Sequence, residues 1–382
     1  MRRDPEERTT SHKIRLVLNR RSFLAGGAAV LAGCRKSEAF SGYAFVANQD
    51  GMAIAAVDLG AFALARLIHL NGHPTDVLSH PTRPSVYALT PENGRVHEID
   101  TSHLRFARSV AVARSAVTVR LSPDANSLYV LCAEPTGMVA LSPATFEVQW
   151  KTPLPGIPRD IDVSADGASI VISMAELPEF ALIDVRERRA RRVNAGGLAG
   201  TVRFRSDGLL WIAARAAGSA LTFFETSSAR PMVDLPLVVH PEHFCFERGG
   251  GQLFVTGSGS DAVVIVYPFL TQVGETVLAG RSPGAMAVSD TLLFVANSQS
   301  GDVTVLSLDS HRVIAVAPVG ASPSCITLTP GDQYALVLDE GSGDMGVLLV
   351  PNIAHTPART AALVTMIPVG SKPVSAAVRA II

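Results

Sequence analysis

The stretch "LFVANSQSGDVTVLSLD", residues 293–309, decides the fold of this chain. Two short runs rich in β-branched and aromatic residues flank a polar turn that contains Gly301 and Asp302. This pattern predicts an antiparallel hairpin, because such runs favour strands and because glycine and aspartate favour tight turns. A single hairpin would say little, whereas a recurring one would specify the whole architecture.

The hairpin recurs along the chain at intervals of a little over 40 residues. A repeat of this length is typical of a ring or an array of small sheets. The other copies are "YAFVANQDGMAIAAVDL" from Tyr43, "SVYALTPENGRVHEID" from Ser85, "SLYVLCAEPTGMVALSP" from Ser127, "SIVISMAELPEFALIDV" from Ser169, "LLWIAARAAGSALTFFET" from Leu209, "QLFVTGSGSDAVVIVYP" from Gln252 and "YALVLDEGSGDMGVLLV" from Tyr334.

Each repeat also has a short run before the hairpin, such as "RSPGAMAVS", and another after it, such as "RVIAVAP". Four short strands per unit, with no helical periodicity, predict the four-stranded antiparallel blade of a β-propeller. We therefore expect an all-β propeller of eight blades, with seven as the alternative if one unit forms something else. The first strands of the units should begin near residues 75, 116, 159, 200, 242, 284, 324 and 374.

The two ends of the repeat predict how the ring closes. The unit that begins at Tyr43 lacks a first strand, and the final "SKPVSAAVRAII" looks like a first strand without a successor. We expect residues 374–381 to complete the blade formed by residues 43–70, which leaves the ring without a free edge. Residues 43–382 would then form a single domain.

The first 34 residues predict an export signal rather than part of the fold. Arg20 and Arg21 precede a short apolar run that is too short to span a membrane. The order Arg-Arg-x-Phe-Leu resembles a twin-arginine signal, although Asn19 and Ala25 depart from its usual pattern. Leu31-Ala32-Gly33-Cys34 resembles a bacterial lipobox, in which Cys34 is lipidated; an ordinary signal peptide with a coincidental cysteine is the alternative.

These signals predict a lipoprotein of the bacterial cell envelope or periplasm, held on the membrane through Cys34 and a tether of residues 35–42. The formal net charge of −1 gives no reason to expect nucleic acid as a partner. The remaining cysteines, Cys132, Cys245 and Cys325, lie in apolar runs far from one another, so we expect buried free thiols. We expect the protein to be a monomer.

The repeat resembles that of YVTN-type β-propellers. "LLFVANSQSGDVTVLSLD" and "YAFVANQDG" match the Tyr/Phe-Val-Thr/Ala-Asn strand and its turn, and "LSPDANSLYVL" and "VSADGASIV" match the connection into that strand. The resemblance covers residues 43–382 and implies a fold rather than a chemistry. The same broad group includes lactonase-type propellers and the d1-haem domain of cytochrome-type nitrite reductases, which is eight-bladed.

In a propeller, the turns that lead into the innermost strands share one face with the turns inside the hairpins. We call this the upper face and expect a basic, histidine-containing ring inside an acidic one. Such an inner ring suits a small anionic ligand or a protein partner; the plainer interpretation is that these are solvated turn residues paired with each other. The candidate binding residues are His73, Arg114, Arg159, His240, His243, Arg281 and Lys372.

The segment "VVHPEHFCF" holds the densest polar cluster, with His240, Glu242 and His243 within four residues. Two histidines could ligate a metal or a haem iron, but no second cluster supplies further ligands, so we predict no metal site. No GxSxG, HExxH, Walker or CxxCH motif is present. We therefore expect a binding or scaffold module; a d1-haem-type oxidoreductase or a lactonase-like hydrolase that uses the same residues, with His73 as a second haem ligand, is the alternative.

Overall fold

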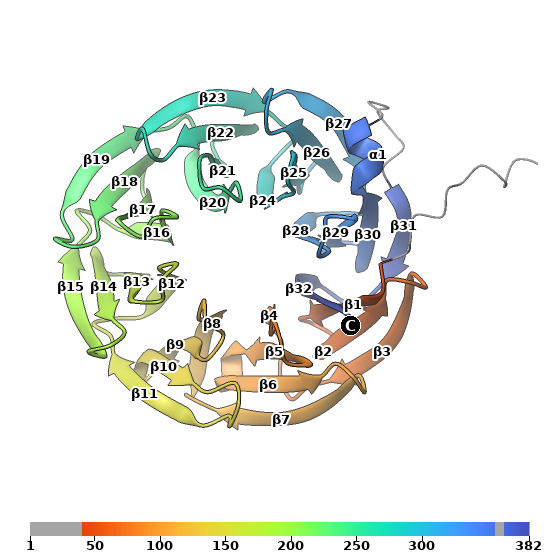
Figure 1. Cartoon of the computed structure of the whole chain (residues 1–382), viewed down its shortest axis with the longest axis horizontal. Coiled ribbons are helices and arrows are strands. Elements are labelled where there is room, and N and C mark those ends of the chain that lie inside the picture. Colours follow the sequence, from red (N-terminus) through yellow and green to blue (C-terminus); the bar gives the residue numbers. More distant parts are fainter. Residues whose placement is uncertain (1–39, 356–362, 382) are drawn as a thin grey trace, which may run out of the picture. The chain divides into compact units, whose positions relative to one another are not determined.

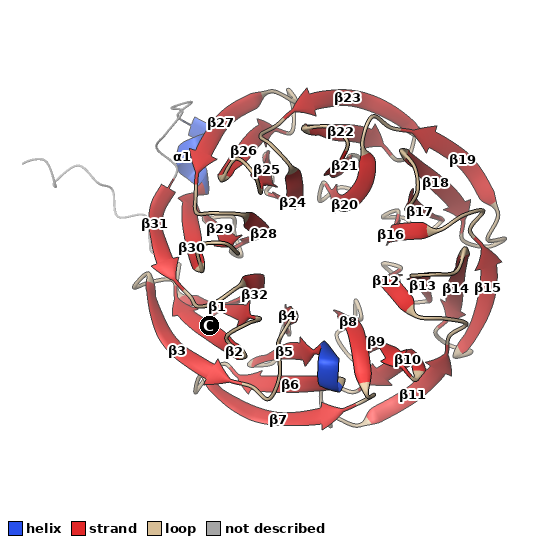
Figure 2. Ribbon diagram, turned by 180° about the vertical axis from the view of Figure 1, so that it is seen from behind, coloured by secondary structure: helices blue, strands red, loops and turns tan. Residues whose placement is uncertain are grey.

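The computed structural model describes residues 40–355 and 363–381, which form a ring of eight four-stranded antiparallel sheets (Figure 1). We name the sheets blades A to H in ring order, beginning with the blade that contains residue 42. The prediction of eight blades is confirmed, and the first strands begin within two residues of the expected positions. Besides strands, the described residues contain the short helix α1 (Val350–His355) and the 3₁₀ turn η2 (Pro91–Asn93) (Figure 2).

The innermost strand of each blade surrounds the axis of the ring, and the second strand pairs with it. From blade A to blade H, the innermost strands are β32 (Pro373–Ala380), β4 (Asp76–Ser79), β8 (Ser115–Leu121), β12 (Pro158–Val163), β16 (Ala199–Phe204), β20 (His240–Phe246), β24 (Pro283–Val288) and β28 (Pro323–Leu328). The second strands are β1 (Gly42–Asn48), β5 (Ser85–Thr90), β9 (Leu128–Glu134), β13 (Ser169–Met174), β17 (Leu210–Arg215), β21 (Leu253–Ser258), β25 (Leu292–Asn297) and β29 (Tyr334–Asp339).

The third and fourth strands complete each blade toward the outer side of the ring. The third strands are β2 (Ala53–Asp58), β6 (Arg95–Asp100), β10 (Thr136–Leu141), β14 (Glu179–Asp184), β18 (Ala220–Glu225), β22 (Ala262–Tyr267), β26 (Asp302–Ser307) and β30 (Asp344–Leu349). The fourth strands are β3 (Ala63–His69), β7 (Arg105–Ala111), β11 (Val148–Pro153), β15 (Arg189–Asn194), β19 (Pro231–Pro236), β23 (Gln272–Leu278), β27 (Val313–Pro318) and β31 (Leu363–Pro368).

The hydrophobic core lies between adjacent blades. All six residues of β25 are buried, whereas β3 buries one residue of seven, because a middle strand is covered on both faces and an outer strand is not. Between blades D and E, Trp211 stacks on Phe224 at 4.1 Å between ring centroids, and Phe180 meets Trp211 edge-on at 4.5 Å. A blade cannot bury both of its faces alone, so each blade is stable only beside its neighbours.

The ring closes as predicted, through pairing of the last strand with the first. β32 runs antiparallel to β1, with Phe45 opposite Ala377. Beyond this pairing, the Arg379 guanidinium donates hydrogen bonds to the backbone carbonyls of His80 and Thr82 in blade B. The C-terminal strand therefore holds two blades together.

Other features of the chain bear on the sequence predictions. Cys132, Cys245 and Cys325 are free thiols, and burial raises the pKa of each to about 11 or 12.

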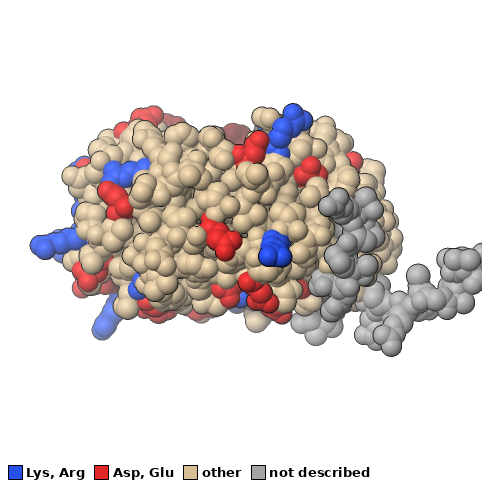
Figure 3. Space-filling model, turned by 90° about the horizontal axis from the view of Figure 1, so that it is seen from above, with Lys and Arg blue, Asp and Glu red and all other residues tan. Residues whose placement is uncertain are grey.

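The predicted export and lipidation residues Arg20, Arg21 and Cys34 lie outside the described residues. Within the described ranges, no helix has the length and apolarity needed to cross a bilayer. The outer side of the ring in Figure 3 carries acidic and basic side chains interspersed among uncharged ones.

Candidate functional site at the upper mouth of the channel

Many residues of the innermost strands are only half-buried although they lie at the centre of the ring, so solvent-accessible space, the channel, remains along its axis. The lead-in turns and the hairpin turns do share the upper face. His73 Nδ1 lies 2.9 Å from the carbonyl of Gln49, and the N–H of Ser282 donates to Asp261 at 2.8 Å. Each contact joins a lead-in turn to a hairpin turn of the preceding blade.

The seven candidate residues do not form one site. Arg114 is paired with Glu134 at 2.8 Å, Lys372 lies 3.8 Å from Glu340, and the backbone N–H of His73 donates to Glu92 at 2.5 Å. Arg114 and Lys372 are thus paired with carboxylates of other turns, whereas His73 contacts Glu92 through its backbone. His73 also belongs to blade B, four blades away from the blade F histidines, so it lies on the opposite side of the ring (Figure 1).

Arg159, His240 and His243 do meet, in a pocket of 530 Å³ on the upper face. Three adjacent blades build it: β12 of blade D, β16 and the β17–β18 hairpin of blade E, and β20 with the end of β21 in blade F. A pocket of this volume lies in the range that holds small ligands. Its lining residues are Arg159, Gly200, Thr201, Arg215, Ala216, Ala217, Gly218, His240, Pro241, Glu242, His243 and Ser258.

The charged groups of the pocket differ in how they are paired. Arg215 is engaged, because it contacts both carboxylate oxygens of Asp234 at 2.9 Å. Glu242 accepts a hydrogen bond from the Ser258 hydroxyl at 2.6 Å. Arg159 is exposed, and within residues 40–355 and 363–381 it forms no ion pair. The pocket therefore offers one uncommitted guanidinium, a group that binds carboxylate and phosphate with paired hydrogen bonds.

The two histidines of β20 point to different neighbours. The strand contains a bulge between Pro241 and His243, which inserts one residue and changes the direction of the side chains that follow. His240 Nδ1 lies 3.2 Å from the Ser219 hydroxyl in the blade E hairpin. His243 instead lies beside blade G, where a Cβ on Gly284 would sit 3.6 Å from its Nε2 atom. In the described part of the chain, no three His, Cys, Asp or Glu side chains converge as metal ligands.

The His243 side chain is exposed to the channel, yet the residues around it still restrict its hydration. Burial lowers the pKa of its imidazole, and the nearby Arg203 charge adds to this effect, while Glu242 opposes it. The side chain is therefore neutral at neutral pH, with ring nitrogens that serve as hydrogen-bond donor and acceptor.

Below the pocket, a belt of charged side chains on the innermost strands connects blades C, D and E. The Asp160 carboxylate contacts Arg203 at 2.6 Å and Arg120 at 3.9 Å. It also accepts the backbone N–H of Val202, at 3.0 Å, and Asp162 accepts that of Phe204, at 2.7 Å. These carboxylates thus satisfy the free edge of β16, which no strand covers.

Two carboxyls of this inner wall, Asp76 and Asp162, have a raised pKa because burial penalises their charged form. The sequence analysis missed this belt. Its signal was present in "RDIDV" of β12, where charged residues alternate with apolar ones in a strand expected to line the channel.

The other side of the inner wall carries small side chains. In blades G, H and A, the innermost strands present Gly284, Ala285, Ser324, Ser375 and Ala376, where blades B to F carry Asp76, Arg120, Asp160, Arg203 and His243. The channel wall is therefore lined by charged side chains in blades B to F and by small side chains in blades G, H and A.

No family model matches the chain. The seven-bladed beta-propeller protein Rv1057 of Mycobacterium tuberculosis is 27% identical over 133 residues, which span 33% of this chain and 34% of that relative. The match therefore spans only about a third of the curated relative, and the seven blades are a property of that protein.

Among solved structures, the dihydro-heme d1 dehydrogenase NirN in complex with DHE matches with a TM-score of 0.72 at 14% identity, over 92% of this chain and 78% of that one. The Kuenenia stuttgartiensis hydrazine synthase matches with a TM-score of 0.58 at 15% identity, over 72% of this chain and 95% of that one. A functionally unknown protein from Desulfotomaculum acetoxidans matches with a TM-score of 0.59 at 13% identity, over 88% and 99% of the two chains. At these identities, the matches establish the fold alone.

Proposed function

We propose that this β-propeller is a membrane-tethered binding module of the bacterial cell envelope. Its ligand is a small anion, or an acidic group of a protein partner, held in the upper pocket of blades D, E and F. The fold is that of a propeller, and its chemistry lies in the residues placed on that fold rather than in the fold itself.

The observation that carries this proposal is the state of Arg159. Arg114 and Lys372, at upper turns of other blades, already contact carboxylates, whereas Arg159 forms no ion pair within the described residues, although Glu242 also lines its pocket. The neutral imidazole of His243, which lines the same pocket, supplies a hydrogen-bond donor. A carboxylate or phosphate placed there gains charge-assisted hydrogen bonds that the protein itself leaves unformed.

Calorimetric titration of the full mature chain with citrate and with inorganic phosphate tests the binding role. We expect Arg159→Gln to weaken binding roughly tenfold or more, since a hydrogen bond to a charged group contributes about 1.5–3 kcal/mol. Arg114→Gln is the matched control, because Arg114 is paired with Glu134 and does not line the pocket. The proposal is wrong if neither anion binds, or if the two variants bind equally well.

The cell-envelope location rests on the sequence of the first 34 residues. The mass of the mature N-terminus, measured on protein from its native membrane, should show lipid on Cys34, and Cys34→Ala should release the protein from the membrane. Replacing Arg20 and Arg21 by lysine should reduce export. A mature chain that begins elsewhere, without lipid, would contradict the tether.

A d1-haem-type oxidoreductase is the second candidate, favoured by the neutral imidazole of His243 on the channel wall and by the fold match over 92% of the chain. The side chains present fit such a group in part: His243 would hold the iron, and Arg159 a carboxylate of the macrocycle. The bound haem would supply the redox chemistry. The visible absorption spectrum of protein purified from its native envelope distinguishes the two candidates, because a Soret band that His243→Ala abolishes favours the haem protein.

A further inference from the structure

A buried carboxyl group lies at the upper end of blade H. Asp339 is the last residue of β29, it is 0% exposed, and its strand partner across the β29–β30 hairpin is Asp344. Within the described ranges, neither carboxylate oxygen of Asp339 accepts a hydrogen bond of good geometry, although the backbone N–H groups of Gly320 and Gly346 lie nearby. A buried ionised carboxylate without a partner is strongly unfavourable, so the charge state of this pair needs an explanation.

The equivalent position in blade G provides that explanation. There, the Asn297 amide donates to the Asp302 carboxylate at 2.6 Å and to the Thr304 hydroxyl at 2.8 Å. Asn48 of blade A likewise donates, to the carbonyl of Val369 at 2.6 Å. Blades A and G thus have an amide donor at the end of the second strand, whereas an ionised Asp339 has no hydrogen to donate.

Blade H also lacks an equivalent of Thr304, the third residue in the blade G contacts of Asn297 and Asp302. Gly346 stands where blade G has Thr304, so the hydroxyl that accompanies Asn297 is missing beside Asp339. The space left by the missing side chain is lined by Asp339 itself, Val319 and the sulfur of Met366. Apolar neighbours of this kind solvate a charge poorly, whereas they tolerate a neutral carboxylic acid.

The charged groups near the pair leave its charge uncompensated. On the blade A side, Glu340 of the same hairpin is engaged by Lys372 at 3.8 Å. On the blade G side, the neighbouring hairpin carries Asp302, and the carbonyl of the adjacent Gly301 accepts the N–H of Val319 at 3.0 Å. Asp344 accepts a hydrogen bond from Ser342, and in the described part of the chain neither Asp339 nor Asp344 contacts a cationic side chain.

We propose that Asp339 and Asp344 together bind one proton, so that the acid form of Asp339 replaces the asparagine amide of blade G as the donor to Asp344. The pair is then a proton-binding site whose protonation affects the structure of the upper mouth. The β29–β30 hairpin that the pair stabilises also carries Glu340, the partner of Lys372. Deprotonation places two carboxylates opposite each other and loosens this hairpin. This inference does not depend on the ligand of the upper pocket.

The electrostatics of the site agree with a proton bound near neutral pH. Burial, together with the neighbouring Asp344 carboxylate, raises the pKa of Asp339 from 3.8 to about 7, and the N–H groups of Gly320 and Gly346 offset this only in part. The folded state therefore binds more protons than the unfolded state between these two values. The unfolding constant should rise about tenfold per pH unit from pH 5 to pH 7 and then level off.

Urea unfolding of the full chain between pH 5 and pH 9 tests the proposal. We expect Asp339→Asn to remove this rise, because the amide donates to Asp344 at every pH, and Asp344→Asn to do the same from the other side. Asn297→Asp is the matched addition: it places a second carboxyl pair in blade G and should steepen the pH dependence. Carbon-13 NMR of aspartate carboxyls should show one group titrating near pH 7 that Asp339→Asn abolishes.

Two outcomes would overturn the proposal. One is an unchanged pH dependence in both asparagine variants. The other is stabilisation of the wild type by Ca²⁺ or Mg²⁺ that chelator reverses and Asp339→Asn abolishes, which would show that a metal ion rather than a proton neutralises the pair.

Discussion

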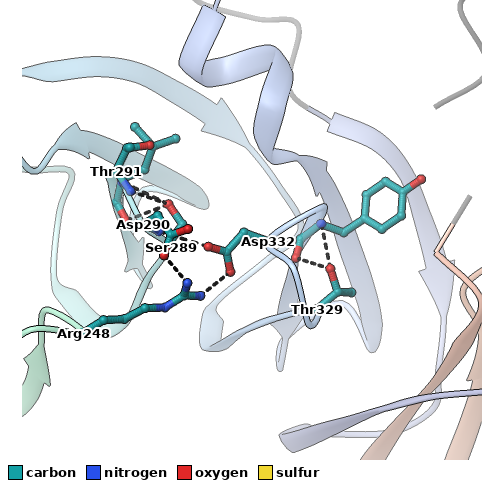
Figure 4. A network of polar contacts seen from close by, with 8 residues as sticks. Arg248, Ser289, Asp290, Thr291, Thr329 and Asp332 are labelled. Atoms are coloured by element: carbon teal, nitrogen blue, oxygen red, sulfur yellow. Dashed lines mark hydrogen bonds and ion pairs between the residues drawn. The ribbon is translucent and has the colours of Figure 1, made fainter. Parts of the chain in front are cut away.

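Arg248 of blade F and Asp332 of blade H form an ion pair of 2.5 Å although blade G lies between their blades (Figure 4). Arg248 also pairs with Asp290 of blade G, whose backbone N–H donates to Asp332 at 3.0 Å. All three residues lie in turns between the first and second strands of their blades, at the lower end of the channel. Turns of two non-adjacent blades touch there, so this network joins three blades at once.

The Arg248 network should contribute modestly to stability. Asp332→Asn should lower the free energy of unfolding by about 0.5–1 kcal/mol, because the side chain of Asp332 is only 13% exposed and both its oxygens are engaged. Asp290→Asn should cost less, since the Asp290 side chain is 75% exposed. Urea unfolding at low and high salt measures both effects; a larger loss from Asp290→Asn would contradict this assignment.

Acid should destabilise the protein through His97. Its side chain is buried, its Nε2 atom lies 2.9 Å from the Thr90 hydroxyl, and burial lowers its pKa from 6.5 to about 4. The folded state therefore binds fewer protons than the unfolded state in this window, and stability present above pH 6.5 is lost as the pH falls toward 4. The loss should be on the order of 3 kcal/mol. His97→Gln should reduce it, while His69→Gln, at an exposed position of β3, should leave it unchanged.

A larger side chain at Gly284 should block the upper channel without unfolding the ring. A Cβ at this position meets only His243, at 3.6 Å, so Gly284→Val should change stability by less than about 1 kcal/mol. Citrate binding should weaken because the new methyl groups lie beside the imidazole. Ala287→Val, three residues further along β24, is the control; equal affinities in the two variants would place the ligand elsewhere.

Removal of β32 should leave the ring open. A chain ending at Gly370 exposes the edge of β1, and we expect it to aggregate or unfold without a single cooperative transition. A synthetic peptide of residues 371–382 should bind the truncated chain and restore cooperative unfolding, by adding the missing strand. The same peptide with Ala377→Asp should fail, since Ala377 packs against the core beside Phe45. Equal rescue by both peptides would contradict the pairing.

The architecture could be predicted because the repeat shows it many times. Turn residues such as Gly301 and strand runs similar to "LFVAN" recur at nearly constant spacing, so an error in interpreting one copy does not alter the predicted ring. The closure was predictable for the same reason, as the unit at Tyr43 lacks a strand that the C-terminal segment supplies.

The candidate site was predictable only in part. The repeat places Arg159 and His243 at the upper ends of two innermost strands, but it does not say which blades are close enough to share a pocket or which charges are already paired. Arg114 and Arg159 both lie near the start of an innermost strand, but Arg114 contacts Glu134 whereas Arg159 lines the pocket. The sequence did not reveal the Asp339–Asp344 pair, because Asp339 resembles the other acidic turn residues. Only comparison with Asn297 of blade G, whose position it occupies in blade H, sets it apart.

The joining of the first and last strands in one sheet also has a consequence for synthesis. Asn48 and Pro373 are partners in blade A, yet 325 positions separate them in the chain. At roughly 5–20 residues per second, the ribosome needs about 15–65 s to make this interval. Throughout that time, β1 has an unpaired edge while the other blades emerge behind it. β32 completes the blade that contains β1, so the ring is whole only after all of its other strands have been made.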